Sequence, residues 1–411
     1  MALTSINSLT SITSNKKLLQ LPIHENEVLY LCAKELFVTL HTIDGAQALS
    51  ATPRQTLIIK TKSKEKKKMK TTRFTTLFAL LATALLSACG GDDPSTNPNP
   101  NPGAGGASGG SGSGTGTVAM AQLRLADPTI FPDDDGTYYL YGTSSDNGFE
   151  VYKSTDLITW EGPCGKTSGG YCLVKGSSYG SKWFWAPQVF KRGDTYYMAY
   201  CADEHLAIAT SDSPMGPFRQ QQLARIPAGM KEIDPFVFFD DDGKTYMYHV
   251  RIVDNNSIYV GEMNADLTKI DESTVELCIK AAPDGWENTE RRSGGVAEGP
   301  TVVKLDGTYY MFYSCNDYQL PTYAVGVATA KSPTGPWTKP AAPIISRDNI
   351  GHNGTGHGDL FRDKDGHWQY VFHTHNNSTT VHTRKTAIVQ LEYTGTGFKV
   401  ADGTFRYLMH K

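Results

Sequence analysis

Three carboxylates occupy corresponding places in a repeated sequence pattern. Asp127 stands in ADPTIF, Asp234 in IDPFVF and Glu298 in EGPTVV, each at the opening of a short apolar segment. Two carboxylates that lie close together titrate at different pH values, so one can serve as a general acid while the other stays ionised as a base. Any one of them alone is more often a strand cap or a turn opener. Three at the same place in a repeat favour acid–base catalysis.

The elements that must position these carboxylates are five copies of one strand pattern. Each copy has a short apolar strand, a turn that usually contains Asp and Gly, an aromatic-rich return strand and a third alternating strand. The copies begin at Ala126, Trp185, Ile233, Glu298 and His357. Such repeated period-two strands, separated by Gly turns, are typical of sheets arranged radially. We therefore predict an all-β fold, a five-bladed β-propeller, over residues 118–411.

In a propeller the first strand of every blade starts near the central axis. The openings of the five copies should therefore meet at one end of the channel, which brings together Asp127, Asp234 and Glu298. His357, which opens the fifth copy, should project into the same channel. Longer insertions follow the first and third copies, and loops of that kind often shape a binding site.

The chain upstream of the repeats carries a different signal. Residues 69–89 have a basic start, a short apolar run and the ending Leu-Ser-Ala-Cys, which resembles a bacterial lipoprotein signal peptide with Cys89 as the lipidated residue. A buried apolar helix is the alternative. Residues 90–117 are rich in Gly, Ser, Asn and Pro and should form a flexible linker. Because a signal peptide should begin its chain, we expect residues 1–68 to be a non-native or disordered upstream extension, with translation starting at Met69.

The charge balance bears on the partners. The first 88 residues hold 12 of the 39 Lys and Arg and 5 of the 42 Asp and Glu, so the remainder has 27 basic and 37 acidic side chains. Such an acidic surface disfavours nucleic acid and anionic lipid. It suits a neutral substrate, and we predict membrane attachment through the lipid anchor alone and a monomer. The predicted location is the bacterial cell envelope, either the periplasm or the outer membrane and cell surface.

Five cysteines lie within the repeats. Cys164 and Cys172 are close together in one loop, and a disulfide and two free thiols are equally compatible with that spacing. Cys201, Cys278 and Cys315 lie in or beside strands and are predicted as small core residues. None of these spacings is that of a zinc site.

From about Gln122 onward the chain resembles glycoside hydrolase family 43, the five-bladed hydrolases of arabinan, xylan and related plant glycans. The resemblance rests on ADPTIF, WAPQV, IDPFVFFDDDGKTYMY, AEGPTVVKLDGTYYMFYS and GTGHGDLF, which occur in order, one per copy. Each string is weak by itself, whereas five in order are specific. The resemblance covers the repeats and none of the residues upstream of them.

This resemblance implies a role for each carboxylate. Asp127 would be the general base that activates water, Glu298 the general acid that protonates the leaving oxygen, and Asp234 the residue that orients Glu298 and tunes its pKa. The family inverts the anomeric centre in a single displacement, for which base and acid stand roughly 6.5–9.5 Å apart. The chemistry requires no cofactor.

The resemblance also implies residues that bind the substrate. Arg251 corresponds to an arginine that reaches sugar hydroxyls, with an ion-paired arginine as the alternative. Trp185 offers an aromatic face for a sugar ring or, alternatively, a core side chain. His357 would lie beneath the site, where it tunes the carboxylates or helps to hold a structural Ca²⁺ through water, since calcium prefers oxygen ligands.

Three further histidines, His373, His375 and His382, stand in FHTHNNSTTVHTR. They could form a metal cluster, but they alternate along a strand and a loop. We predict a local structural role for them.

For the substrate, which the resemblance implies is an oligo- or polysaccharide, we predict an exo-acting α-L-arabinofuranosidase that works on plant cell-wall pentose glycans. A β-xylosidase and an endo-α-1,5-L-arabinanase are the alternatives within the family. A non-catalytic glycan-binding propeller is the alternative of another class, because a fold does not specify an activity. Such a binding protein would have no need of three carboxylates.

Overall fold

The computed structural model describes residues 18–24, 27–32, 38–42, 120–253 and 255–411, and the chain divides into the units Met1–Gly114 and Thr115–Lys411. In the first unit, β1 (Leu18–His24), β2 (Glu27–Cys32) and β3 (Val38–Thr42) form an antiparallel sheet in that order. This sheet lies within the segment 1–68, whose non-native origin stays a prediction. The signal peptide with Cys89 and the linker 90–117 lie outside the described residues.

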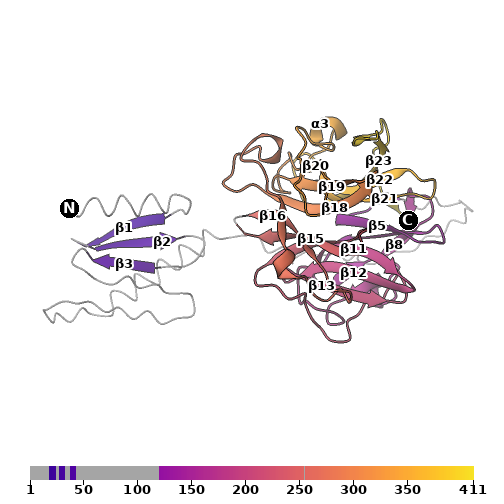
Figure 1. Ribbon diagram of the computed structural model, residues 1–411, viewed down its shortest axis with the longest axis horizontal. Coiled ribbons are helices and arrows are strands. Elements are labelled where there is room, and N and C mark those ends of the chain that lie inside the picture. Colours follow the sequence, from indigo (N-terminus) through magenta and orange to yellow (C-terminus); the bar gives the residue numbers. More distant parts are fainter. Residues whose placement is uncertain (1–17, 25–26, 33–37, 43–119, 254) are drawn as a thin grey trace, which may run out of the picture. The chain divides into compact units, whose positions relative to one another are not determined.

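The second unit is built from five antiparallel sheets, which confirms the all-β prediction (Figure 1). The first holds β5 (Ala126–Pro132), β6 (Tyr138–Thr143) and β8 (Tyr152–Ser154), and the second β11 (Trp185–Arg192), β12 (Thr195–Ala202) and β13 (His205–Ser211). The third holds β14 (Glu232–Phe239), β15 (Thr245–Ile252), β16 (Asn256–Glu262) and β17 (Glu276–Ile279). The fourth holds β18 (Ala297–Leu305), β19 (Thr308–Cys315) and β20 (Ala324–Ala330). The fifth holds β21 (Gly356–Arg362), β22 (Trp368–Thr374), β23 (Lys385–Tyr393) and β24 (Phe398–Val400), with β25 (Arg406–Tyr407) also paired to β23.

The first strands of the five sheets contact one another in a closed order. β5 contacts β11, β11 contacts β14, β14 contacts β18, β18 contacts β21, and β21 contacts β5. Figure 1 shows β5 between β11 and β21. The starts of the five repeats are therefore neighbours in space although they are far apart in the sequence.

Short strands complete the second unit. β7 (Gly148–Glu150) pairs with β10 (Tyr171–Val174). β26 (Met409–His410) pairs antiparallel with β4 (Ala121–Gln122) and parallel with β9 (Thr159–Trp160). The last strand thus fastens the two ends of this unit together. Among the described residues, one short α-helix, α3 (Arg347–Ile350), precedes the fifth sheet, and three 3-10 helices lie in loops at Ser168–Gly170, Glu272–Thr274 and Gly285–Glu287.

The turns between first and second strands follow from the Asp-Gly pairs. The N–H of Gly136 donates to Asp133 O at 3.0 Å, and the N–H of Gly243 donates to Asp240 O at 3.2 Å. Gly136 and Gly243 have φ values of 82° and 84°, which residues with a side chain rarely adopt. These turns set the register of the strands on either side of them.

The apolar core lies between neighbouring sheets. Five clusters of buried side chains join the first sheet to the second, the second to the third, the third to the fourth, the fourth to the fifth, and the fifth to the first. Tyrosines of the return strands are prominent in them, and Tyr141 and Tyr248 are fully buried. Their hydroxyls donate to Pro214 O and Pro333 O, both at 2.7 Å. An unpaired hydroxyl there would cost about 1–3 kcal/mol.

The cysteines of the second unit are all free thiols. For Cys164 and Cys172, the structure therefore shows the free-thiol alternative, and Cys172 Sγ donates to Phe149 O at 3.3 Å. Cys201 and Cys315 are buried, as predicted, whereas Cys278 is partly exposed and packs against the core between the third and fourth sheets.

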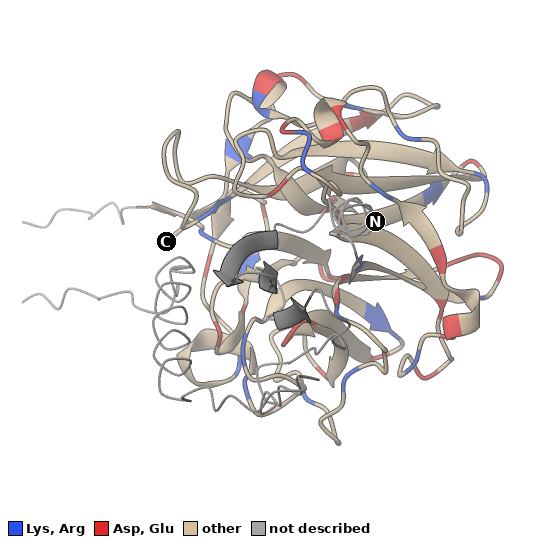
Figure 2. Ribbon diagram, turned by 90° about the vertical axis from the view of Figure 1, so that its left-hand side faces the viewer, with Lys and Arg blue, Asp and Glu red and all other residues tan. Residues whose placement is uncertain are grey.

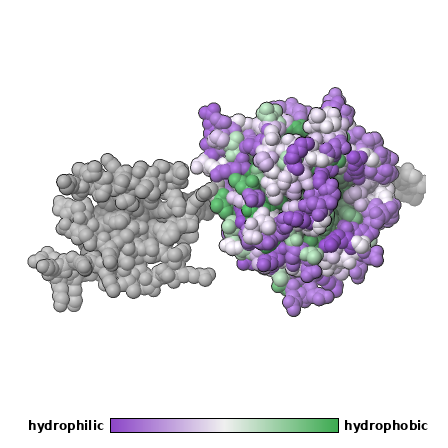
Figure 3. All heavy atoms as spheres, viewed as in Figure 1, coloured by the Kyte–Doolittle hydropathy of each residue, from purple (hydrophilic) through white to green (hydrophobic). Residues whose placement is uncertain are grey.

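The surface of the second unit is mixed in character. Acidic and basic segments are interspersed along its loops and strand ends (Figure 2). Hydrophilic residues dominate the face drawn in Figure 3, with small apolar patches between them. Within the described ranges, no helix has the length and apolar character needed to cross a bilayer.

Candidate active site

Each of the five first strands carries a bulge near its start. Its register against the second strand shifts there, and one residue has a left-handed backbone: Asp127 (φ 47°), Ala186 (47°), Asp234 (55°), Gly299 (60°) and His357 (44°). A bulge inserts an extra residue and turns side chains toward new directions. All five bulge residues line one small cavity of about 30 Å³, so the five sheets bring these positions to a common place.

The bulges also determine which acceptors the N–H groups of the bulge residues bind. A bulged residue leaves its N–H outside the ladder, and that group needs another partner. In three sheets the acceptor is a side chain on the second strand of the preceding sheet: Thr143 Oγ1 for Ala186 (3.0 Å), Ser314 Oγ for His357 (2.8 Å) and His373 Nδ1 for Asp127 (3.2 Å). In the fourth sheet the Gly299 N–H donates instead to the carboxylate of Asp234, at 3.1 Å from Oδ2.

Asp127 is surrounded by groups that stabilise its ionised form. Arg384 Nη1 donates to Oδ1 at 3.0 Å, and Thr143 Oγ1 donates to Oδ2 at 2.7 Å. His373 Nδ1 and His357 Nδ1 lie 3.4 and 3.5 Å from Oδ1. Burial alone would raise the pKa of Asp127, but Arg384, followed by the charge on His357, outweighs it and holds the pKa well below its usual range. Asp127 is therefore an ionised carboxylate that can accept a proton.

Glu298 has the opposite environment. Tyr323 Oη donates to Oε1 at 2.7 Å and Asn256 Nδ2 donates to Oε2 at 2.8 Å, and both donors are neutral. Burial, followed by the nearby negative charge of Asp234, raises the pKa of Glu298 to about 7. A carboxyl with this pKa is protonated in a useful fraction of molecules near neutral pH, which is what a general acid requires.

Asp234 interacts electrostatically with both of these carboxyls. Its Oδ2 is 3.9 Å from His357 Nδ1, and burial raises its pKa. Burial also disfavours the charged form of His357, but Asp234, Asp127 and Glu298 together raise the pKa of that imidazole. Asp127, Asp234, Glu298 and His357 therefore titrate as one coupled group, in which the charge of each depends on the others.

The absence of a side chain at Gly299 lets His357 pack beside the site carboxylates. A Cβ at this position would lie 2.8 Å from Cδ2 of the His357 ring. Its φ of 60° is also unfavourable for a residue with a side chain. The bulge that follows Glu298 therefore makes room for the histidine of the next sheet.

The local structural role predicted for His373 is incomplete. His373 is fully buried on β22, yet its ring contacts Asp127 and stacks on Tyr323 with centroids 5.6 Å apart. Burial and then the charge of Arg384 lower its pKa to about 3, so it is a neutral member of the site. The prediction missed this because the second strands place polar side chains opposite the bulges, a register that strand alternation alone does not reveal.

The other two histidines of that segment have local contacts. His375 Nε2 lies 2.9 Å from Tyr318 O, and the His382 ring packs edge-on against the Tyr318 ring. These contacts hold the loop that precedes Arg384.

Arg384, which sequence reasoning did not single out, is the arginine that contacts a site carboxylate. Arg251 instead makes the ion pairs of the alternative interpretation: its Nε donates to Glu232 Oε1 at 2.9 Å, and its Nη2 donates to both carboxylate oxygens of Glu272. A role for Arg251 toward the sugar stays a prediction. Arg384 lies just before β23, outside the repeated strings, so the repeat gave no signal for it.

Trp185 stands one residue before the bulge of the second sheet, the same relative place as Glu298 in the fourth. It is partly buried and stacks on Trp183 with centroids 5.7 Å apart, while Lys182 Nζ lies 3.6 Å from the centroid of the Trp183 ring. Part of its surface is therefore covered by protein. The arrangement leaves sugar stacking on Trp185 as a prediction.

The channel below His357 bears on the predicted calcium ion. Asp359 in its wall already accepts hydrogen bonds from Thr129 and Thr301, and burial raises the pKa of its carboxyl to about 6. Arg384 further opposes a cation beside Asp127. A structural calcium ion in this channel stays a prediction, and the chemistry proposed below has no step through one.

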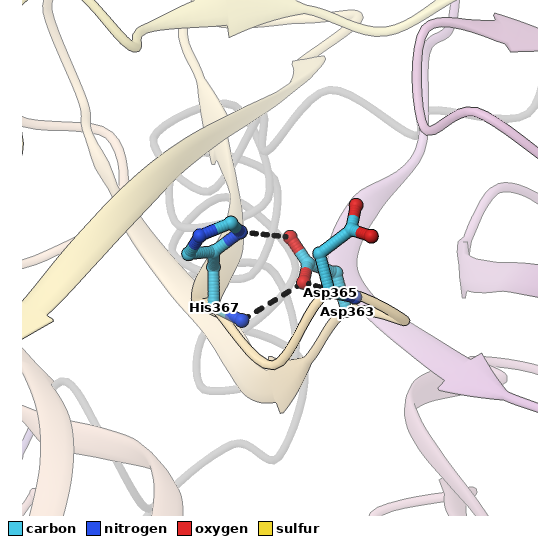
Figure 4. Close-up of side chains that lie close together, drawn as sticks. All are labelled: Asp363, Asp365 and His367. Atoms are coloured by element: carbon cyan, nitrogen blue, oxygen red, sulfur yellow. Dashed lines mark hydrogen bonds and ion pairs between the residues drawn. The ribbon is translucent and has the colours of Figure 1, made fainter.

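A second group of possible metal ligands, Asp363, Asp365 and His367, lies in the turn between β21 and β22 (Figure 4). Asp363 Oδ1 accepts the N–H groups of Asp365 and His367 at 3.0 and 2.9 Å, and its Oδ2 accepts from Gln369. The same kind of turn recurs at Asp133 and Asp240, where each carboxylate also accepts a backbone N–H. The group is a strand turn and carries no metal assignment.

The sequence profile of Glycosyl hydrolases family 43 matches residues 119–398. The chain belongs to glycoside hydrolase family 43. This confirms both the resemblance inferred from the motifs and the prediction of a glycoside hydrolase.

Several relatives of this family 43 enzyme are recognisable. It is 28% identical over 333 residues to a beta-xylosidase from Xylanibacter ruminicola, covering 66% of this chain and 95% of the relative. It is 24% identical over 286 residues to a beta-D-galactofuranosidase from Aspergillus niger, covering 63% of this chain and 77% of the relative. A solved endo-1,4-beta-xylanase from Bacteroides thetaiotaomicron is 37% identical with a TM-score of 0.66, and the match covers 72% of this chain and all of that one.

Proposed function

We propose that the protein is an inverting, exo-acting glycoside hydrolase that removes terminal α-L-arabinofuranosyl units from plant cell-wall pentose glycans. The observation that carries the proposal is the pairing of two unlike carboxyls, Asp127 beside cationic partners and Glu298 beside neutral ones, both of which interact electrostatically with Asp234. We also propose that the ring of five sheets is a five-bladed β-propeller, in which the five bulges surround the upper end of the channel.

In the proposed reaction, Asp127 removes a proton from water as the water oxygen attacks the anomeric carbon. Glu298 gives its proton to the glycosidic oxygen as the bond from that oxygen to the anomeric carbon breaks. The products are a sugar of inverted configuration and a shortened glycan, with Asp127 protonated and Glu298 ionised. Proton exchange with solvent restores both groups. Asp234 supports the cycle by raising the pKa of Glu298.

The burial of the three carboxylates supports attack on the ends of glycan chains. Asp127, Asp234 and Glu298 are at most 8% exposed, so a reacting sugar must enter a recess. A terminal unit enters a recess more easily than an internal one. Endo-α-1,5-L-arabinanase activity is accordingly the weaker alternative for this chain.

A β-xylosidase is the second candidate function. The observation in its favour is the match to the beta-xylosidase from Xylanibacter ruminicola, which spans 95% of that relative. Arabinofuranose and xylopyranose are both pentoses, and the acid–base pair serves either one. The outer subsite contacts must decide between them.

For location, we propose that the signal peptide at residues 69–89 directs the protein to the bacterial envelope and that Cys89 is lipidated. The proposed protein is a monomer that contacts membrane through this anchor alone. Labelling with a fatty-acid analogue in the native host, beside Cys89→Ala, tests the anchor: label in the wild type only is expected, and equal label in both proteins would contradict it.

The substrate assignment is tested by hydrolysis of aryl α-L-arabinofuranoside, aryl β-D-xyloside, arabinan, arabinoxylan and xylan by the full chain. We expect arabinose as the first product. Asp127→Asn and Glu298→Gln should each lose about 10²–10⁴-fold in kcat, the usual contribution of one acid or base. Xylose as the only product would move the assignment to the second candidate, and binding without turnover would contradict the proposal.

A further inference from the structure

Tyr323 joins the two halves of the site although it belongs to none of the repeated strings. It comes from the loop between β19 and β20, is fully buried, and donates its hydroxyl to Glu298 Oε1 at 2.7 Å. Its ring stacks on His373, which contacts Asp127. One side chain thus contacts the acid directly and the base through one intermediate.

The fifth sheet is shaped to receive this ring. Gly356 is paired with His373 across β21 and β22, and a Cβ at Gly356 would lie 2.4 Å from Tyr323 Cδ1. No side chain larger than glycine leaves room for the ring there. The absence of a Cβ and the stacked imidazole together fix the plane of Tyr323 and therefore the place of its hydroxyl.

The two oxygens of Glu298 differ in what their partners allow. Among the residues that the structure describes, Glu298 Oε1 is the one hydrogen-bond partner of the Tyr323 hydroxyl. If Oε1 carried the acid proton, Tyr323 would have to accept it and leave its own proton unpaired in a buried place, which is unfavourable. Oε2 faces Asn256, which is partly exposed, so substrate or water can replace that amide.

We propose that Tyr323 is a positioning residue for the general acid: it holds Glu298 Oε1 as a permanent acceptor and thereby places the catalytic proton on Oε2, the oxygen facing Asn256. The inference rests on the proposed function of Glu298 as the acid. Tyr323 itself does not transfer a proton. In this arrangement the leaving oxygen of the glycan takes the place of the Asn256 amide.

Tyr323→Phe is the direct test, because the ring and its stacking remain and only the hydroxyl is lost. A donor to a carboxylate favours the ionised form, so its loss should raise the pKa of Glu298 and move the basic limb of kcat/KM upward by about one pH unit. A mispositioned acid should slow a glycoside with a poor alkyl leaving group by about 10–100-fold. A dinitrophenyl glycoside, which needs no protonation, should change less than about threefold.

Tyr141→Phe is the matched control, since it removes another buried hydroxyl that donates at 2.7 Å, to Pro214 O. It should leave the leaving-group ratio and the basic limb unchanged. Equal slowing of both glycosides by Tyr323→Phe, with an unmoved basic limb, would reduce Tyr323 to a structural residue and overturn the proposal.

Infrared titration of the Glu298 carboxyl separates this proposal from the proposed function. The carboxyl band, identified by its loss in Glu298→Gln, should titrate at higher pH in folded Tyr323→Phe than in the wild type. If the wild type hydrolyses no glycoside, the proposed function fails while the titration still tests the hydrogen bond. An unchanged titration would overturn the role of Tyr323 whether or not the enzyme is active.

Discussion

The first and fourth sheets contribute two carboxyls, Asp127 and Glu298, that have opposite electrostatic surroundings. Asp127 accepts from Arg384 and Thr143 and lies beside two imidazoles, whereas Glu298 accepts from the neutral groups of Tyr323 and Asn256. Both are equally buried, at 8% exposed. Desolvation therefore raises the pKa of each, and the neighbours decide the outcome: well below the usual range for Asp127 and about 7 for Glu298.

This difference shows that the acid and base roles are set by the second strands and loops more than by the carboxyls themselves. In three sheets the first strand carries an acidic residue at its bulge or directly before it. Arg384, His373 and Tyr323, which come from outside those strands, make the sites unlike. Substituting these partners should reduce the difference in pKa between Asp127 and Glu298.

The largest effect is expected from Arg384→Met, which removes the cation beside Asp127. Burial would then dominate, and the acidic limb of kcat/KM should move upward by about 1–3 pH units. The folded-state pKa of Asp127 is depressed, so its pairing stabilises the fold above the unfolded pKa of about 3.9 and is lost as the pH falls through the folded value. At neutral pH the variant should lose about 3–5 kcal/mol of unfolding free energy.

Denaturant unfolding at several pH values and pH–rate profiles check this expectation. Arg192→Met is a suitable control, because Arg192 is an exposed arginine that donates to Ala265 O. An unmoved acidic limb in Arg384→Met would show that Asp127 does not depend on this arginine.

Asp234→Asn should change the pKa of Glu298, the second carboxyl of the pair. The negative charge of Asp234 raises the pKa of Glu298, so its removal should lower that pKa and move the basic limb downward by about one pH unit. The downward direction distinguishes Asp234 from Tyr323, whose loss should move the same limb upward. An upward shift in Asp234→Asn would contradict the coupling described above.

The smallest effect is expected from Gly299→Ala, which inserts a methyl group between the fourth and fifth sheets. The left-handed backbone costs about 1–2 kcal/mol for a residue with a Cβ. The contact with His357 adds to that cost and should shift the imidazole away from Asp127 and Asp234. Calorimetric unfolding and the pH–rate profile measure the two consequences separately.

Gly307→Ala provides the control for backbone strain alone. Gly307 also has a left-handed φ, of 70°, but no atom lies within 4 Å of the position of its Cβ. It should lose stability without a change in the pH–rate profile. If both variants behave alike, packing of Gly299 against His357 has no influence on the site.

The repeat in the sequence predicted the strands, the Asp-Gly turns and the convergence of Asp127, Asp234 and Glu298, because each of these features is written in contiguous residues. It could not predict the partners. Arg384 and Tyr323 stand in loops without a repeat, and a loop conformation depends on packing against distant strands. The resemblance implied Arg251, which follows a recognisable strand, but its guanidinium pairs with Glu232 and Glu272.

The bulges are a second feature that the residues alone concealed. The openings of the five copies were expected to be equivalent, but Glu298 stands one residue before its bulge, whereas Asp127 and Asp234 are bulge residues themselves. A polar residue opposite the bulge, at Thr143, Ser314 and His373, was a usable signal. Aligning the ends of the second strands would have drawn attention to His373.

The most direct test of the central claim, a base at Asp127 and an acid at Glu298 in a single displacement, is the configuration of the sugar at the moment of release. Proton NMR during hydrolysis of an aryl pentoside by the full chain, recorded before mutarotation, reports the first anomer formed. We predict the inverted anomer alone. First release of the retained anomer would contradict the account, because it requires a carboxylate that bonds to the sugar rather than one that activates water.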